Sequence, residues 1–243
     1  MATTRYKRAP ITEAVVELRL AAPLPVEQVE KIKDLLTEDY PLAPQITQQV
    51  TIRSDAPQPA VEFVGYRMSS ADAANIINVQ RHAFSISRLA PYVGWEDFIG
   101  RARSNWVVWK KVAGWREVTR VGVRYINRID IPNADESPIL IENYLAFRPA
   151  FPEFEGAQGV EAFAINGSMN IANSPFKLIL NAGTTPSPLV RTVSFLLDID
   201  ISQEGNLPKN DDSLWRLIDE IRALKNGIFE ASITDLSRRL FSS

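Results

Sequence analysis

Hydrophobic and polar positions divide the first part of the chain into strands and helices. Residues 11–20, ITEAVVELRL, alternate apolar and charged side chains, which predicts a half-buried β-strand. Residues 25–36 place apolar side chains at helical spacing after Pro25, a residue that suits a first helical turn. A long amphipathic helix is expected between Gly94 and Gly114. The strands predicted between these helices lie at about 46–53, 61–69, 74–80 and 83–89.

The second part of the chain repeats this order of elements. A long strand is predicted at 117–131, followed by a short helix around 138–147. The final helix is expected to start at Asp211 or Asp212, either of which can cap it, and Gly227 predicts a kink or break within it. Its apolar stripe comprises Leu214, Leu217, Ile218, Ile221, Leu224, Ile228, Ile233 and Leu236. Further strands are expected near 159–172, 175–183 and 190–203.

These patterns predict an α+β protein built from two similar halves, residues 1–114 and 115–243. Each half contains a strand, a helix, several antiparallel strands and a further helix, which favours an internal duplication. The element order resembles the TATA-binding-protein-like fold, in which a curved antiparallel sheet carries helices on one face. In that arrangement the two halves share one continuous sheet as a single domain. A helix-grip sheet, which wraps a long C-terminal helix and encloses a ligand cavity, is the alternative.

Composition narrows the chemistry that the chain can perform. The 243 residues carry a net charge of −2, so no overall basic field attracts nucleic acid. There is no cysteine, and the single histidine, His82, is expected at a hairpin turn, which removes thiol chemistry and most histidine-based catalysis. No Gly-rich phosphate loop is present, and no apolar run is long enough to cross a bilayer. We therefore expect a cytoplasmic protein without cofactor, metal or membrane contact, and these features favour a non-catalytic role over an enzymatic one.

The strand at 117–131 carries a row of arginines. Arg120, Arg124 and Arg128 recur at every fourth position, so in a strand they share one face at intervals of about 13 Å. Glu13 and Glu17 recur at the same spacing in the first strand. If the first strands of the two halves meet antiparallel at the centre of the sheet, these opposite charges form a structural charge ladder.

The alternative interpretation of the arginine row is an anion- or nucleic-acid-binding surface. Arg67 and Arg88, on other predicted strands, would join the row on the open face of the sheet. Asp198 and Asp200 share a face of their own strand and would partly neutralise such a surface. This acidic pair has the chemistry to hold a divalent cation, but we expect it to pair with nearby basic side chains instead.

Aromatic residues at a corner of the chain form a third group of candidates. In RLAPYVGWEDF, residues 88–98, Tyr92 and Trp95 follow Pro91, and Trp115 comes after the long helix. Such residues commonly pack a strand-to-helix corner. Tyr and Trp also dominate the energetics of protein interfaces, so Tyr92, Trp95 and Trp115 are candidate partner-binding residues.

Four segments, mainly within residues 9–132, resemble the hallmark segments of a bacterial protein family. They are PITEAVVELRL, GYRMSS, FSISRLAPYVGWEDF and TRVGVRYINRIDIP. The family is uncharacterised and sporadically distributed among bacteria, and no activity is established for it. The resemblance therefore implies no catalytic residue, while such a patchy, mobile distribution implies an accessory role, for example in a defence or toxin–antitoxin system.

Together these observations predict a non-catalytic binding module whose partner is another protein. A nucleic-acid or nucleotide binder that uses the arginine row is the first alternative, and it requires arginines that carboxylates have not neutralised. A small-ligand-binding helix-grip protein is the second, and it requires a closed apolar cavity. The oligomeric state is left open by the sequence.

Overall fold

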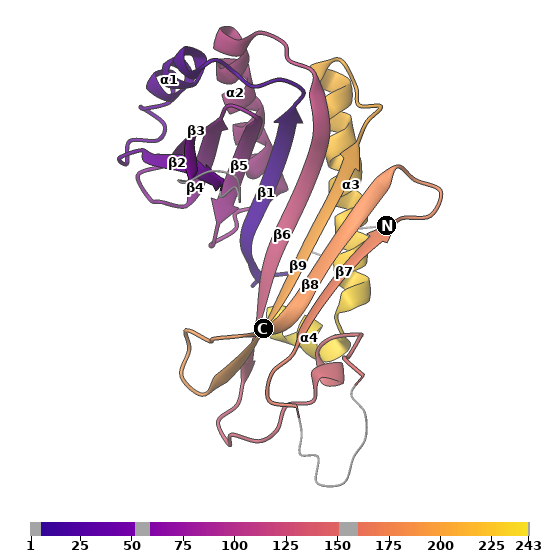
Figure 1. Cartoon of the computed structure of the whole chain (residues 1–243). Coiled ribbons are helices and arrows are strands. Elements are labelled where there is room, and N and C mark those ends of the chain that lie inside the picture. Colours follow the sequence, from indigo (N-terminus) through magenta and orange to yellow (C-terminus); the bar gives the residue numbers. More distant parts are fainter. Residues whose placement is uncertain (1–5, 52–58, 151–159, 243) are drawn as a thin grey trace. The chain divides into compact units, whose positions relative to one another are not determined.

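The computed structural model describes residues 6–51, 59–150 and 160–242 of the chain. The protein is of the α+β class, as the sequence predicts, with an antiparallel sheet and α-helices (Figure 1). No helix among the described residues is both long enough and apolar enough to span a membrane.

The first half of the chain forms the expected elements. Its strands are β1 (Ile11–Leu20), β2 (Gln45–Thr51), β3 (Ala60–Ser69), β4 (Asn75–Gln80) and β5 (Ala83–Leu89). Its helices are α1 (Val26–Leu35) and α2 (Trp95–Ala113). Residues 52 and 53, included in the predicted strand at 46–53, lie outside the described residues.

The second half departs from the prediction in its helices. Its strands are β6 (Val118–Pro132), β7 (Ala164–Asn170), β8 (Phe176–Thr185) and β9 (Thr192–Glu204). Its helices are the short 3-10 helix η1 (Ile141–Asn143), α3 (Asp211–Ser232) and α4 (Asp235–Ser242). Residue 159, at the start of the strand predicted near 159–172, lies outside the described residues.

Two expectations for the helices of the second half are wrong. The helix predicted around 138–147 is only the single turn η1, because the chain after it pairs with the link between α3 and α4. Leu145 forms a β-bridge with Ile233, and the amide of Ala146 donates to the carbonyl of Ser232. Of the kink or break predicted at Gly227, the break is absent, since α3 continues to Ser232.

The strands are joined in the order β2-β3-β4-β5-β1-β6-β9-β8-β7. β1 and β6, the first strands of the two halves, are therefore neighbours in the sheet. In each half the first strand lies beside the last one, which is β5 for the first half and β9 for the second. β2 and β7 are the two edge strands among the described residues.

Contacts between residues divide the chain into two compact units. Unit 1 comprises residues 1–13, 123–202 and 215–243, and unit 2 comprises the intervening residues 14–122 and 203–214. This division does not follow the predicted halves, which rest on the order of elements along the chain.

Aromatic side chains fill the core of unit 2. The rings of Trp106 and Trp109, one helical turn apart on α2, stack with centroids 4.6 Å apart. Phe84 of β5 meets the Trp106 ring edge-on at 5.3 Å. All three side chains are fully buried, so α2 is held on β5 by its predicted apolar stripe.

The core of unit 1 lies between its strands and α3, which runs behind β9, β8 and β7 in Figure 1. Tyr125 of β6 is buried and contacts Lys225 of α3. Because successive strand residues point to opposite faces, Arg124 points away from α3. We call the face that carries Arg124 the outer face of unit 1.

Candidate functional site: a polar row across four strands

A chain of hydrogen bonds crosses the outer face of unit 1 from β6 to β7. Nε and Nη2 of Arg124 donate to the two carboxylate oxygens of Asp198 on β9, each at 2.8 Å. Nδ2 of Asn181 on β8 donates to Oδ2 of Asp198 at 2.9 Å. The amide of Asn166 on β7 donates in turn to Oδ1 of Asn181. We call these four residues the polar row.

Strand alternation places the polar row on this face. Asp198 stands between the core residues Leu197 and Ile199, so its side chain points outward from the strand. Asn166 lies directly opposite Asn181 in the β7–β8 register, and side chains opposite each other in antiparallel strands share a face. The row is therefore perpendicular to the strands, with one residue from each.

Charge within the polar row is compensated. The Asp198 side chain is only 3% exposed, whereas that of Arg124 is 46% exposed. The hydrogen bonds to Asp198 raise the pKa of Arg124, although burial opposes this rise. A paired guanidinium and carboxylate sum to zero charge, so the row offers oriented donors and acceptors instead of a net positive site.

Apolar side chains flank the polar row on the same face. Ile126, Ile179 and Leu196 each stand two residues from a member of the row on their own strand, and all three are half-buried. A surface that combines partly exposed aliphatic groups with fixed polar groups matches the composition of protein interfaces.

The third arginine of β6 is paired on its own strand. Nε and Nη2 of Arg128 donate to Asp130 at 2.8 and 3.0 Å. Ser194 of β9 donates its hydroxyl to the same carboxylate at 2.5 Å. Burial raises the pKa of Asp130, but these hydrogen bonds outweigh it and lower the pKa below its usual value.

The first arginine of β6, Arg120, belongs to unit 2 and is buried. Nη1 of Arg120 donates to Oε1 of Glu17 on β1 at 2.9 Å, and its Nε lies 3.8 Å from Glu204. Gly122 provides the space, since a Cβ there would lie 2.5 Å from Nη1 of Arg120. The pairing with Glu17 is the kind that a charge ladder predicts, whereas Arg124 and Arg128 take partners that the ladder interpretation did not name.

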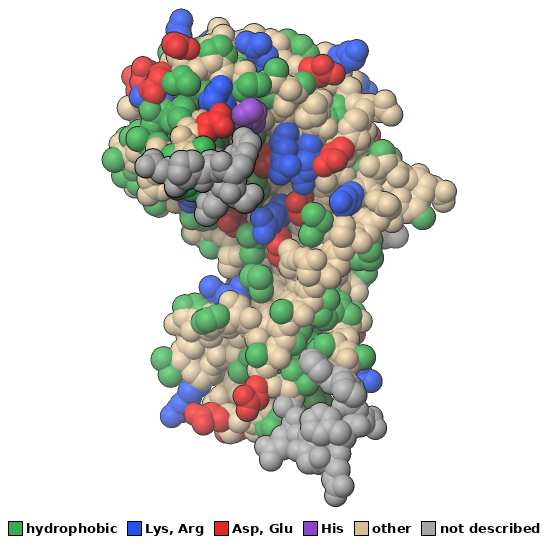
Figure 2. All heavy atoms as spheres, in the orientation of Figure 1, with side chains coloured by type: hydrophobic (Ala, Val, Ile, Leu, Met, Phe, Trp, Pro, Cys, Tyr) green, Lys and Arg blue, Asp and Glu red, His purple; other side chains and the backbone are tan. Residues whose placement is uncertain are grey.

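The remaining predicted acidic residues lie near this arrangement. Glu13 is half-buried and near enough to Arg124 for its charge to raise the pKa of that side chain. Asp200 acts on Arg124 in the same direction. Among the described residues, no group of three or more acidic or histidine side chains has the arrangement to hold a metal ion. Figure 2 shows basic and acidic side chains interspersed on the face in view.

Arg67 and Arg88 do not extend the arginines of β6 into a larger basic surface. Arg88 is buried, and its Nε and Nη2 donate to the carbonyl of Pro91 at 3.2 and 3.1 Å. Arg67 is half-buried on β3, between Gln45 of β2 and Asn78 of β4 in the strand register. Arg88 thus fixes the turn that follows β5.

The candidate aromatic residues differ in exposure. Trp95 is buried at the start of α2, with its ring 6.0 Å from that of Phe98. Tyr92 is half-buried against the same Phe98 ring at 6.4 Å. Trp115 is exposed, in a shallow depression that Lys110 and residues 209–212 also line. The structure therefore places the first two in a packed corner and leaves Trp115 accessible.

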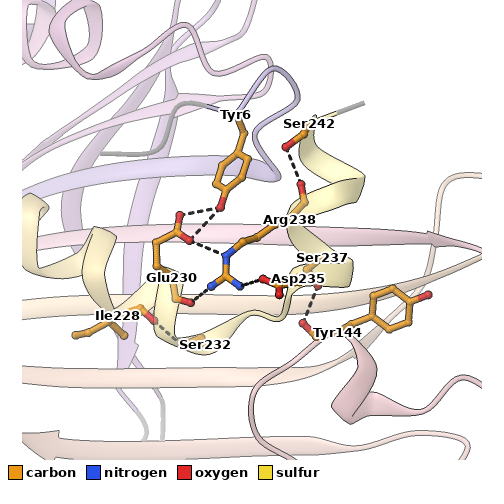
Figure 3. Close-up of polar contacts among 9 residues, drawn as sticks. All are labelled: Tyr6, Tyr144, Ile228, Glu230, Ser232, Asp235, Ser237, Arg238 and Ser242. Carbon is orange, nitrogen blue, oxygen red and sulfur yellow. Dashed lines mark hydrogen bonds and ion pairs between the residues drawn. The ribbon is translucent and has the colours of Figure 1, made fainter. Parts of the chain in front are cut away.

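A second polar network in unit 1 joins Tyr6 to α3 and α4 (Figure 3). The Tyr6 hydroxyl donates to both carboxylate oxygens of Glu230, at 2.8 and 3.0 Å. Nε of Arg238 on α4 donates to Glu230 at 3.1 Å, and its Nη1 donates to Asp235 at 2.8 Å. Burial, followed by the hydrogen bond and charge of Glu230, raises the pKa of Tyr6 to about 12. This network is structural, since its members satisfy one another.

Sequence reasoning did not select the asparagines of the polar row or Lys225. A signal for the asparagines exists, because asparagine is disfavoured inside strands and both occupy strand interiors. Lys225 also follows the helical repeat, four residues after Ile221 and four before Phe229, and all three are buried. The buried stripe of α3 thus includes Lys225 and Phe229, where the apolar pattern predicted Leu224 and Ile228.

Comparison of the chain with protein-family models and with curated proteins gives no match. The likeness of its four segments to a sporadically distributed bacterial family therefore stays a resemblance.

Proposed function

We propose that the protein is a non-catalytic binding module and that a protein partner docks on the outer face of unit 1. The observation that carries this proposal is the polar row, in which buried Asp198 orients Arg124 and Asn181. Side chains held in this way lose little freedom on binding, which favours affinity. The exposed ends of the row, Asn166 and Arg124, are the groups that a partner would contact.

The charge balance favours a protein partner over nucleic acid. A phosphate backbone is bound by basic groups whose charge is not already neutralised, and affinity grows with their number. Arg124 and Arg128 each form a two-point ion pair within the chain. The amides of the row and its aliphatic flanks offer a partner hydrogen bonds and apolar contact, which suit a polypeptide surface.

The strand order supports the inferred duplication. In both halves the first strand lies beside the last, the other strands follow outward in reverse order, and β1 and β6 meet at the centre. We place the module in the cytoplasm because the chain lacks cysteine. A role within a defence or toxin–antitoxin system rests on the family resemblance.

The experiment is a tagged pull-down from the native host, with and without nuclease. Asn166→Lys and Ile179→Lys place a charge on the outer face, and Met169→Lys is the matched control, because residue 169 points to the other face of β7. We expect a stoichiometric protein that survives nuclease, binds wild type and Met169→Lys, and is lost with the two outer-face variants.

Two outcomes would contradict the proposed function. Capture that is equal for all variants would remove the outer face from the interaction. Nucleic acid that copurifies with wild type and is lost with Arg124→Gln would instead support the arginine-based alternative. Circular dichroism and thermal unfolding of each variant establish that it is folded before its binding is compared.

A further inference from the structure

Among the residues that the structure describes, β2 is the terminal strand on one side of the sheet. Six of its seven residues are exposed. Its sequence, QITQQVT, contains no charged residue and no proline. Natural edge strands usually carry charges, prolines or bulges that prevent pairing with another chain. The one register shift here, between Thr47 and Gln48, skips Val64 and so places the bulge on β3, which leaves β2 itself regular.

The residues of β2 are self-complementary about Gln48. If two copies of β2 pair antiparallel around this residue, Ile46 lies opposite Val50 of the other copy, and Thr47 lies opposite Gln49. Gln48 then faces its own counterpart, and Gln45 faces Thr51. Every apolar side chain meets an apolar one and every polar side chain a polar one. No charges are brought together within the pair, so its electrostatics do not oppose it.

An apolar patch continues from β2 to β3 on the same face. Ile46 and Val50 are 61% and 59% exposed, and Val61, directly opposite Val50 in the register, is 57% exposed. Paired residues in antiparallel strands share a face, so Val50 and Val61 form one surface. A second copy related by a twofold axis at Gln48 would place its own apolar patch beside this one, and the sides of Ile46 and Val50 that meet the other copy would be buried.

We propose that β2 is a homodimerisation edge, at which two copies pair antiparallel with the twofold axis at Gln48. A twofold axis makes an interface from the same patch on both copies, which is what the self-complementary sequence fits. β7, the other edge strand, suits this role less well. It has Gly167 at its centre, and its Asn166 side chain is engaged with Asn181. This interface lies in unit 2 and is separate from the outer face of unit 1.

Disulfide trapping tests the register directly, because the chain contains no cysteine. In the proposed dimer, residues at the axis have Cβ atoms about 5 Å apart, close enough for Gln48→Cys to form a disulfide with small adjustment. Thr51→Cys is the matched control, since its counterpart lies six residues along the strand, about 20 Å away. We expect oxidation of full-length protein to give covalent dimers with Gln48→Cys and not with Thr51→Cys. Equal crosslinking of the two variants would overturn the proposed register.

Sedimentation equilibrium tests the association without a crosslink. Val50→Lys introduces two unpaired ammonium groups into each dimer, so we expect the dissociation constant to rise about tenfold or more. Met169→Lys adds the same charge on β7, where residue 169 is 48% exposed, and is expected to leave dimerisation unchanged. A monomeric wild type at all concentrations, or equal weakening by the two substitutions, overturns the proposal. Position 50 is exposed, so the substitution is expected to leave the fold intact. Thermal unfolding of Val50→Lys checks this, because a variant that no longer associates but unfolds at a similar temperature has lost the dimer and not the fold.

Discussion

The ammonium of Lys225 lies 3.6 Å from the centre of the Tyr125 ring, in the buried layer between α3 and β6. The ring face attracts a cation, which favours the charged amine by about 0.5–2 kcal/mol. Burial acts in the opposite direction and has the larger effect, because the pKa of Lys225 is lowered from 10.5 to about 7. The nearby charge of Arg222 also lowers this pKa, whereas the charge of Glu230 raises it. Lys225 therefore destabilises the fold of unit 1 at pH values at which its amine is protonated in the folded protein.

Substitution of Lys225 by methionine is expected to stabilise the protein in a pH-dependent way. Between about pH 7 and pH 10.5 the unfolded chain holds the lysine proton and the folded chain does not, so wild-type stability rises with pH in this window. Lys225→Met removes the titration. We expect it to raise the free energy of unfolding by about 2 kcal/mol or more at pH 6, with the difference from wild type shrinking toward pH 10.

Urea unfolding at pH 6, 8 and 10 measures this effect. Lys177→Met, which removes an exposed lysine on β8, is the control and is expected to change stability little at any pH. A difference for Lys225→Met that stays constant with pH would mean that the amine is charged in the folded protein across this range. The favourable contact with Tyr125 would then dominate over desolvation.

Hydrophobic periodicity predicted the strands and long helices because it reports burial directly. Apolar and polar side chains alternate along residues 11–20, and apolar side chains recur at every turn of α2. Both patterns can be recognised without knowing which elements these segments pack against. The region around η1 was mispredicted because its partner, the link at Ile233, is distant in sequence. Gly227 was taken for a break because its cost in a helix was counted without the packing of Lys225 and Phe229 on either side.

Tyr6→Phe is expected to destabilise the protein by about 1.5 kcal/mol near neutral pH, because it removes the donor to the Glu230 carboxylate. The pKa of Tyr6 is raised from 10.0 to about 12, so the folded state retains the phenol proton longer than the unfolded state. The contribution of Tyr6 to the free energy of unfolding is therefore fully present below pH 10 and is lost as the pH rises through 12.

Thermal unfolding from pH 7 to pH 11.5 tests the Tyr6 contribution. The curves of wild type and Tyr6→Phe should converge at the alkaline end. Tyr144→Phe is the matched control, since among the described residues the Tyr144 hydroxyl donates no hydrogen bond, and its ring instead packs 6.4 Å from Phe195. An equal loss in the two variants at pH 7 would show that the Glu230 hydrogen bonds contribute nothing specific.

Two ion pairs on the outer face should differ in their contribution to stability. Asp198 is 3% exposed and Asp130 is 25% exposed, although each binds its arginine through two hydrogen bonds. Arg124→Ala leaves the Asp198 carboxylate buried without its cation, so we expect a loss of about 2 kcal/mol, against less than about 1 kcal/mol for Arg128→Ala.

A double-mutant cycle measures the coupling of each pair. The Arg124–Asp198 coupling free energy is expected to exceed that of Arg128–Asp130 by about 1 kcal/mol. If the two couplings are equal, burial of Asp198 does not strengthen its pair, and the polar row would lose the rigid centre on which the proposed function depends.

The candidate site was predictable only in part, because its partners come from four strands. The sequence placed Arg124 and Asp198 on one face of their own strands, but alternation gives no register between strands. The pairing therefore remained open between Glu13, Glu17 and the acidic residues of β9. Asn166 and Asn181 became part of the site only once the β7–β8 register placed them opposite each other.

Gly65 is expected to be indispensable beside the β3 bulge, where it lies opposite Gln80 of β4. A Cβ at position 65 would lie 2.1 Å from the carbonyl oxygen of Val79 and 2.7 Å from the Cα of Gln80. Both atoms belong to the backbone, so neither can rotate away as a side chain would. Gly65→Ala should therefore cost about 2–4 kcal/mol of stability, in the range of substitutions that force backbone shifts. Gly167→Ala on β7 is the matched control, because the nearest atom to its Cβ lies 3.9 Å away. Chemical unfolding of the two variants decides the point: an alanine tolerated equally well at both positions would mean that β3 and β4 separate at the bulge without cost.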